Sequence, residues 1–329
     1  MCKQHYSGSN LIIVHDHFVL GSMCFVVLIV LLSACALSIS SPLNPEESQA
    51  TSTGQPQRVP SKEPSDDIED PLESMSATKF IYPGSSWKTN PIIPDLSLRA
   101  FEIYQNGLAL GSNPHAFSKV GDGEIASNWF LNIYALKPEN YNLGPHSELA
   151  AVIDYFAGSF ARMSLAARVG FNTTRILDPL FAMNDVCEVE ETPLECELRH
   201  HRPSFAIISL GTNQVWTPEL FETELRQIVE ICIRRGVLPI LSTKGDNLEG
   251  DHHINVIIAD VAREYEIPLW NFWLAIQSLP DQGLQLDGEH LTWAENDFSD
   301  PEVMSHAWPN RNLTALKLLQ RLMLELGSL

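Results

Sequence analysis

Basic side chains are scarce in this sequence. It contains 21 Lys and Arg residues against 41 Asp and Glu residues, and its formal net charge is −20. Because recognition of phosphate needs clusters of Lys and Arg, this balance argues against nucleic acid and against an anionic membrane surface as partners. Cysteine is also infrequent, with 6 residues, and no Cys/His spacing fits a zinc site. The sequence therefore predicts neither a metal nor a cofactor, and it contains no internal repeat.

Charged residues are absent from residues 18–39, where the chain is most apolar. Such a run followed by small residues is typical of an export signal, predicted here as residues 1–35. Leu32-Ser33-Ala34-Cys35 resembles a bacterial lipobox, in which cleavage precedes a cysteine that becomes lipidated. An uncleaved anchor is the alternative, since about 20 apolar residues span a bilayer. Both interpretations place the remaining chain outside the cytoplasm and tether it to a membrane, and we favour a lipoprotein with its lipid on Cys35.

Residues 36–78 are rich in Ser, Pro and acidic residues and poor in aromatic and β-branched clusters. Such a segment buries too little apolar surface to offset its ordering entropy, so we expect a disordered linker. Residues 79–329 would then form one folded domain. We expect this acidic, tethered domain to be a monomer.

Apolar runs and helical stripes alternate along residues 79–329. Continuous apolar runs predict buried strands at residues 205–210, 237–243 and 267–272, and a shorter run ends at residue 120. Amphipathic stripes predict helices at residues 147–156, 254–265 and 311–326, and one that starts at Thr217-Pro218 with the threonine hydroxyl as its cap. This alternation predicts a three-layer α/β/α fold with a parallel sheet, of the doubly wound, flavodoxin-like class.

Two cysteines, Cys187 and Cys196, lie close together in a polar segment, residues 184–199, that is predicted to be a loop. Outside the cytoplasm, such a pair more often forms a disulfide than a metal site. The sequence therefore predicts a disulfide between them.

Four short motifs stand at or near the ends of predicted elements: Gly121-Asp122-Gly123, Gly170 within residues 166–174, Gly211-Thr212-Asn213, and Asp287-Gly288-Glu289-His290. Ligands of open α/β sheets bind at the carboxyl ends of the strands, so these motifs are candidates for one site. Each alone has a simple structural explanation, as a tight turn, a helix cap or a surface pair. Their order along the chain is more informative than any single motif.

In this order the motifs resemble those of the SGNH/GDSL hydrolases, and the resemblance covers nearly all of residues 115–320. It implies the SGNH-hydrolase fold and hydrolysis of acyl esters or acetylated glycans, with a small-molecule or glycan ester as ligand. In this family a histidine is the general base and an aspartate orients it, which matches His290 and Asp287. The resemblance also implies an oxyanion hole of three N–H donors, matching Gly123, Gly170 and the Asn213 amide, with Asp122 and Gly211 as supporting motif residues.

Gly123 stands where this family has its nucleophilic serine, so the usual covalent acyl-enzyme cannot form there. Ser118 and Ser127 are the nearest hydroxyls in the sequence, and neither is predicted at the strand tip. One hypothesis is a hydrolase in which His290 and Asp287 activate water. The alternative is a catalytically silent module that binds a ligand or glycan at the cell surface. A chance substitution in an otherwise active family is a third explanation.

Four tryptophans near the predicted strand ends and motif loops are candidate stacking surfaces in such a binding module: Trp216, Trp270, Trp273 and Trp293. We expect Trp270 and Trp273 to belong to the core instead.

Overall fold

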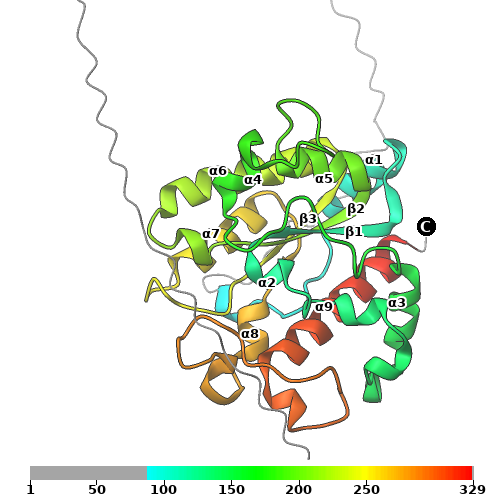
Figure 1. Cartoon of the computed structure of the whole chain (residues 1–329), viewed down its shortest axis with the longest axis vertical. Helices are drawn as coiled ribbons and strands as arrows, with labels where there is room; N and C mark the ends of the chain where they lie inside the picture. Colours follow the sequence, from blue (N-terminus) through cyan, green and yellow to red (C-terminus); the bar gives the residue numbers. More distant parts are fainter. Residues whose placement is uncertain (1–86, 328–329) are drawn as a thin grey trace, which may run out of the picture. The chain divides into compact units, whose positions relative to one another are not determined.

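The structure is a computed structural model that describes residues 87–327 (Figure 1). The predicted signal segment, Cys35 and the predicted linker lie outside the described residues. The strands are β1 (Asn113–Gly121), β2 (Pro203–Ser209), β3 (Leu238–Ser242) and β4 (Leu269–Trp270). The helices are α1 (Leu98–Ala109), α2 (Gly123–Ala126), α3 (Ala150–Tyr155), α4 (Thr173–Leu177), α5 (Pro193–His201), α6 (Pro218–Arg234), α7 (His253–Glu264), α8 (Phe272–Ile276) and α9 (Ala307–Leu326). Within residues 87–327, none of the helices has the length and apolar character needed to cross a bilayer.

The four strands form one parallel sheet in the order β1-β2-β3-β4. A short segment adds to the sheet beyond β1, where Gly121 forms a parallel bridge with Ala167. The N–H of Gly121 donates to the Ala166 carbonyl at 3.0 Å, and its carbonyl accepts from the Arg168 N–H at 3.1 Å. The chain therefore runs from β1 outward to residues 166–168 and then returns across β1 to β2. This reversal is the switch point at which doubly wound folds bind ligands.

Helices cover both faces of the sheet, as the alternating side chains of β1 illustrate. The Phe117 ring packs edge-on against Phe156 and Phe160, which follow α3, with ring centroids 5.7 and 5.4 Å apart. The next side chain, Ser118, points to the other face and donates to Glu197 of α5. Figure 1 shows α4, α5 and α6 on one side of the strands and α3, α8 and α9 on the other. The predicted three-layer α/β/α fold is confirmed.

Several predicted boundaries were wrong in detail. Residues 147–156 are not one helix capped by Ser147, because a 3₁₀ helix, Gly144–Leu149, precedes α3. Pro145 lies in its first turn, and His146 interrupts it with φ −110° and ψ 38°. Helix α6 begins at Pro218 as predicted, but the Thr217 side chain makes no capping hydrogen bond, since its ψ of 58° departs from the extended backbone of a capping residue. Helix α9 begins at Ala307, earlier than the predicted residue 311.

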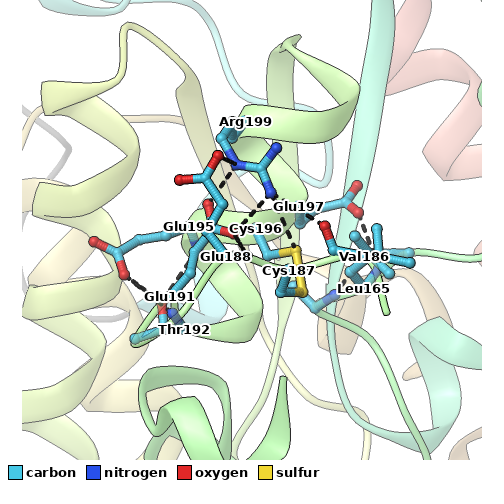
Figure 2. Close-up of a disulfide and its surroundings, with 12 residues drawn as sticks. Leu165, Val186, Cys187, Glu188, Glu191, Thr192, Glu195, Cys196, Glu197 and Arg199 are labelled. Carbon is cyan, nitrogen blue, oxygen red and sulfur yellow. Dashed lines mark hydrogen bonds and ion pairs between the residues drawn. A yellow bond between two sulfur atoms is a disulfide. The ribbon is translucent and has the colours of Figure 1, made fainter. Parts of the chain in front are cut away.

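Cys187 and Cys196 form a disulfide with their Cα atoms 5.3 Å apart (Figure 2). The segment is not all loop, because Cys196 lies on α5. Thr192 and Glu195 cap this helix reciprocally, which starts it inside a region whose polar composition suggests a loop. Arg199 ties the preceding turn to the helix by donating to both carboxylate oxygens of Glu191, at 2.7 and 2.8 Å. The disulfide and this ion pair hold residues 187–199 together, and Glu197 of α5 joins this segment to β1 by accepting from Ser118.

Candidate active site

The four motifs meet at one cavity of about 440 Å³ at the carboxyl ends of the strands. Gly123, Gly170, Asn213 and His290 all line it, although they come from four separate segments. The remaining lining residues are Asp122, Glu124, Ser127, Trp129, Val169, Thr212, Gln285, Glu289, Leu291 and Trp308. The cavity therefore lies at the switch point, next to β1, the 166–168 segment and β2.

The turn after β1 requires glycine at one position and tolerates a side chain at another. Gly121 has φ +148°, and a Cβ there would lie 1.9 Å from the Ser209 carbonyl oxygen, so only glycine fits. Asp122 then caps α2 by accepting the Glu124 N–H at 3.2 Å. At Gly123 the nearest atom to an added Cβ would be Val169 Cγ2, at an ordinary contact distance of 3.8 Å. The fold therefore does not require glycine at position 123.

Gly170 lies in a tight turn that the 166–168 segment brings beside Gly123. Its φ is +77°, a conformation that favours glycine. The Arg175 guanidinium donates to the Gly170 carbonyl at 2.5 Å, and Asn172 caps α4 by accepting the Arg175 N–H at 3.0 Å. In the hydrogen-bond pattern of residues 87–327, the backbone N–H groups of Gly123 and Gly170 have no partner. Both are available to a ligand in the cavity.

Asn213 is held in the cavity by a hydrogen bond from its Nδ2 to the Phe171 carbonyl at 2.9 Å. An amide nitrogen carries two hydrogens, so one N–H remains for a ligand. The glycine before this turn is required: Gly211 has φ +129°, and a Cβ there would lie 2.5 Å from Ile254 Cγ2. Gln214, the next residue, faces away from the cavity and accepts from the Thr173 N–H at 2.8 Å. It thereby joins the third motif to the second.

A buried ionic network stabilises the turn that carries Asn213. Thr212 Oγ1 donates to Asp246 at 2.7 Å. The Lys244 ammonium bridges Asp246 at 2.5 Å and Glu249 at 2.6 Å, and the three charged side chains are almost inaccessible to water. Buried charges are tolerated when they are paired in this way. The network fixes the backbone of the Asn213 turn.

His290 and Asp287 form a hydrogen-bonded pair in a tight turn at the rim of the cavity. His290 Nδ1 lies 2.8 Å from Asp287 Oδ2, and Asp287 Oδ1 accepts the N–H groups of Glu289 and His290, both at 3.0 Å. These donors lower the pKa of Asp287 to about 2, and the hydrogen bond to Asp287 raises the pKa of His290 above its ordinary value. The side chains are 66% and 48% exposed, so water reaches the pair. A neutral His290 with Nδ1–H donated to Asp287 presents an unprotonated Nε2 as a base.

Sequence reasoning missed an acidic group in the cavity, Glu124, and its partner Arg311. The Glu124 carboxylate is 24% exposed and lies 3.3 Å from a guanidinium nitrogen of Arg311, which is fully buried. The guanidinium is enclosed by three rings, with its centre 4.5 Å from the Phe272 centroid. Burial raises the pKa of Glu124, and burial together with Glu124 raises the pKa of the Asp122 carboxyl to about 7. No local pattern links residues this far apart in the sequence, so only the fold reveals the pair.

The two serines near the missing nucleophile lie in different environments. Ser127 lines the cavity and accepts the Trp129 N–H at 3.1 Å. Ser118 is buried against α5 and does not reach the cavity.

The four candidate tryptophans divide between the core and the surface. Trp270 is in the core as expected, whereas Trp273 is only partly buried and packs edge-on against Trp87, with ring centroids 4.8 Å apart. Trp216 is exposed and does not line this cavity. Trp293 is half-exposed and packs against Trp129, which sequence reasoning did not single out.

Comparisons with known proteins give a similarity of structure only. No family model and no curated protein sequence matches the chain. The structure is similar to a GDSL-like lipase from Bacteroides thetaiotaomicron VPI-5482, with 14% identity and a TM-score of 0.38 over 67% of this chain and 98% of that one. It is also similar to an acetylxylan esterase from Geobacillus stearothermophilus, with 13% identity and a TM-score of 0.39 over 64% and 94% of the two chains. A psychrotrophic esterase from Pseudoalteromonas sp. shares 16% identity, with a TM-score of 0.38 over 63% and 97%.

Proposed function

We propose that this protein is an ester hydrolase of the SGNH/GDSL kind in which His290, oriented by Asp287, activates a water molecule. The observation that supports it is the convergence of His290, Gly123, Gly170 and Asn213 on one cavity. Attack on an ester carbonyl needs a base on one side and donors for the developing oxyanion on the other. This cavity is lined by both kinds of group.

In the proposed reaction, an ester carbonyl oxygen lies against the free N–H groups of Gly123, Gly170 and Asn213. His290 Nε2 takes a proton from water as the water oxygen bonds to the carbonyl carbon. Asp287 stabilises the imidazolium that forms. The tetrahedral intermediate then collapses, the C–O bond to the alcohol breaks, and the imidazolium returns its proton to the leaving alkoxide. The products are a carboxylic acid and an alcohol.

In this reaction scheme, Gly123 occupies the position of the family's nucleophilic serine. In triad hydrolases that lose one member, the remaining groups accelerate the reaction about 10³–10⁴-fold over water. We expect the wild-type protein to act in this range, because it retains the base and the oxyanion donors without the nucleophile.

A second candidate function, a silent module that binds esters without hydrolysing them, is favoured by the missing hydroxyl at Gly123. Such a protein would use Asn213 and His290 as polar contacts to a bound acyl group.

In either case we propose that the domain lies outside the cytoplasm and is tethered through Cys35 or an uncleaved anchor. The disulfide supports an oxidising compartment. Incorporation of labelled palmitate that Cys35→Ser abolishes would support the lipid anchor, and labelling unchanged by Cys35→Ser would contradict it.

The decisive experiment measures hydrolysis of p-nitrophenyl acetate by purified wild type, His290→Ala and His253→Ala. His253 is a matched control, since its ring also pairs with an aspartate, Asp251 at 2.6 Å, but it does not line the cavity. We expect turnover above the buffer rate in wild type and in His253→Ala, and turnover slower by about 100-fold or more in His290→Ala, which keeps the oxyanion donors but loses the general base. A wild type no faster than buffer refutes the hydrolase. In that case, NMR chemical-shift changes that acetate causes in wild type but not in His290→Ala would favour the binding module.

A further inference from the structure

A cavity of about 400 Å³ lies at the amino ends of the strands, the opposite end of the sheet from the candidate active site. Its lining comes from the residues just before β1, β2 and β3 and from the ends of the helices that lead to them, and none of it lines the first cavity. Half of the lining residues are arginines, and none is acidic. This arginine cavity is lined by Leu110, Ser112, Leu198, Arg199, Arg202, Arg234, Arg235 and Val237.

The arginines of this cavity outnumber the carboxylates that neutralise them. Arg199 pairs with Glu191 at 2.7 Å and lies 3.5 Å from Glu188 (Figure 2). The other three arginines are exposed, and within residues 87–327 none of them forms an ion pair or a side-chain hydrogen bond. In a chain with a net charge of −20, three unpaired positive charges around one cavity are a local reversal of sign. The cavity therefore attracts anions.

Helix ends explain some of these arginines without a ligand. Helices α1, α5 and α6 all end beside the cavity, and a positive side chain at the carboxyl end of a helix stabilises the helix dipole. Arg234 is the last residue of α6 and Arg235 is its C-cap, so both have this structural role. A dipole interaction needs no particular backbone conformation, so it does not explain the backbone of Arg202.

Arg202 ends α5 in a left-handed conformation, with φ 51° and ψ 48°, which is unfavourable for a residue with a side chain. The other two helices pass through left-handed turns at glycines, Gly111 after α1 with φ +86° and Gly236 after α6 with φ +68°. The Arg202 guanidinium lies directly beside Gly111, because a Cβ at Gly111 would be 2.2 Å from Arg202 Nη2. The chain therefore keeps an arginine where glycine would be less strained. Strain that persists at one residue indicates a function for its side chain.

We propose that the arginine cavity binds a ligand with a multiply charged phosphate group, held by Arg202, Arg234 and Arg235. A guanidinium binds phosphate through two parallel hydrogen bonds, and a group with several charged oxygens can pair with more than one arginine at a time. Binding here does not depend on ester hydrolysis, since the two cavities share no residue. The acidic composition of the chain does not reveal such a site, because α5 and α6 bring the arginines together from separate segments.

Isothermal titration calorimetry at physiological ionic strength should show saturable binding of pyrophosphate to the purified wild-type protein. We expect binding at least tenfold weaker in Arg202→Gly and in the double variant Arg234→Ala/Arg235→Ala. Glycine suits the left-handed backbone, so Arg202→Gly should be no less stable than wild type in thermal unfolding. Arg263→Ala is the matched control, because it removes one positive charge from α7 outside both cavities, and it should bind like wild type.

Absence of saturable binding to wild type refutes the inference. A folded Arg202→Gly that binds pyrophosphate as tightly as Arg263→Ala does also refutes it, because the ligand would then lie elsewhere on the protein. Flotation with phosphatidylcholine vesicles, with or without phosphatidic acid, identifies the source of the phosphate. Capture that increases with phosphatidic acid and is lost in Arg202→Gly supports the site with a lipid headgroup as ligand. Pyrophosphate binding without such an increase supports it with a soluble phosphate.

Discussion

Gly123→Ser should convert this protein into a faster, nucleophilic esterase without disturbing its fold. A Cβ at this position would lie 3.8 Å from Val169 Cγ2, which is ordinary van der Waals contact. Gly123 is the first residue of α2, and no left-handed backbone conformation requires glycine there. The hydroxyl would enter a cavity that His290 also lines.

The expected effects on stability and activity differ greatly in size. Replacing a glycine at the start of a helix changes the free energy of unfolding by about 1 kcal/mol or less, here in the stabilising direction, because the unfolded chain loses freedom. Adding a nucleophile next to an oriented histidine should raise kcat/KM for p-nitrophenyl acetate by at least about 100-fold, which corresponds to about 2.7 kcal/mol of transition-state stabilisation. A second change, His290→Ala, should remove this gain.

The assay combines steady-state kinetics with mass spectrometry after treatment with a phosphonate ester, which should modify Gly123→Ser once and leave wild type unmodified. Gly121→Ser is the matched contrast two residues earlier. A Cβ there would overlap the Ser209 carbonyl oxygen at 1.9 Å, so it should cost more than about 3 kcal/mol of stability or prevent folding. If Gly123→Ser folds with normal stability but shows neither faster turnover nor phosphonate labelling, the assignment of Gly123 to the nucleophile position is wrong.

The pKa of His290 and the disulfide each give a further prediction. The hydrogen bond to Asp287 raises the pKa of His290, and only neutral imidazole acts as a base, so esterase activity should fall with decreasing pH around a midpoint above 6.5. Asp287→Asn should move this midpoint of the pH–rate profile to lower pH. An unmoved midpoint would show that another group titrates. Replacing Cys187 and Cys196 by serine opens a loop with a sequence separation of 9, and urea unfolding should show a loss of about 2–3 kcal/mol, which reducing agent reproduces in wild type but not in the double variant.

The sequence alone was sufficient for the fold class, because strand and helix patterns are local. Burial can be inferred directly from apolar runs such as residues 205–210 and from apolar stripes such as that of α6. The order of the elements and a parallel sheet could therefore be predicted. The sequence also marked the glycines at the strand ends, but it did not show which contacts require glycine there. Gly121 and Gly211 are fixed by contacts with Ser209 and Ile254, which no local pattern contains.

Element ends were less predictable, because they depend on packing and on backbone geometry. Thr217 has the composition of a helix cap, yet its backbone conformation keeps the hydroxyl from capping. The 3₁₀ turn before α3 is likewise decided by the surrounding structure. The start of α5 is different, because its capping box, Thr192 and Glu195, is a local pattern that sequence reasoning overlooked inside a polar segment.

The motifs of the candidate site could be read from the sequence, since each is a short run of residues at a strand end or in a turn. What only the tertiary structure decided is which distant residues meet: Glu124 pairs with Arg311, and the Trp129 ring packs against Trp293. These pairs join segments far apart in the chain, and their burial and exposure exist only after folding. Sequence determined where the chemistry could lie, whereas the fold determined the charge, the shape and the extent of the surface around it.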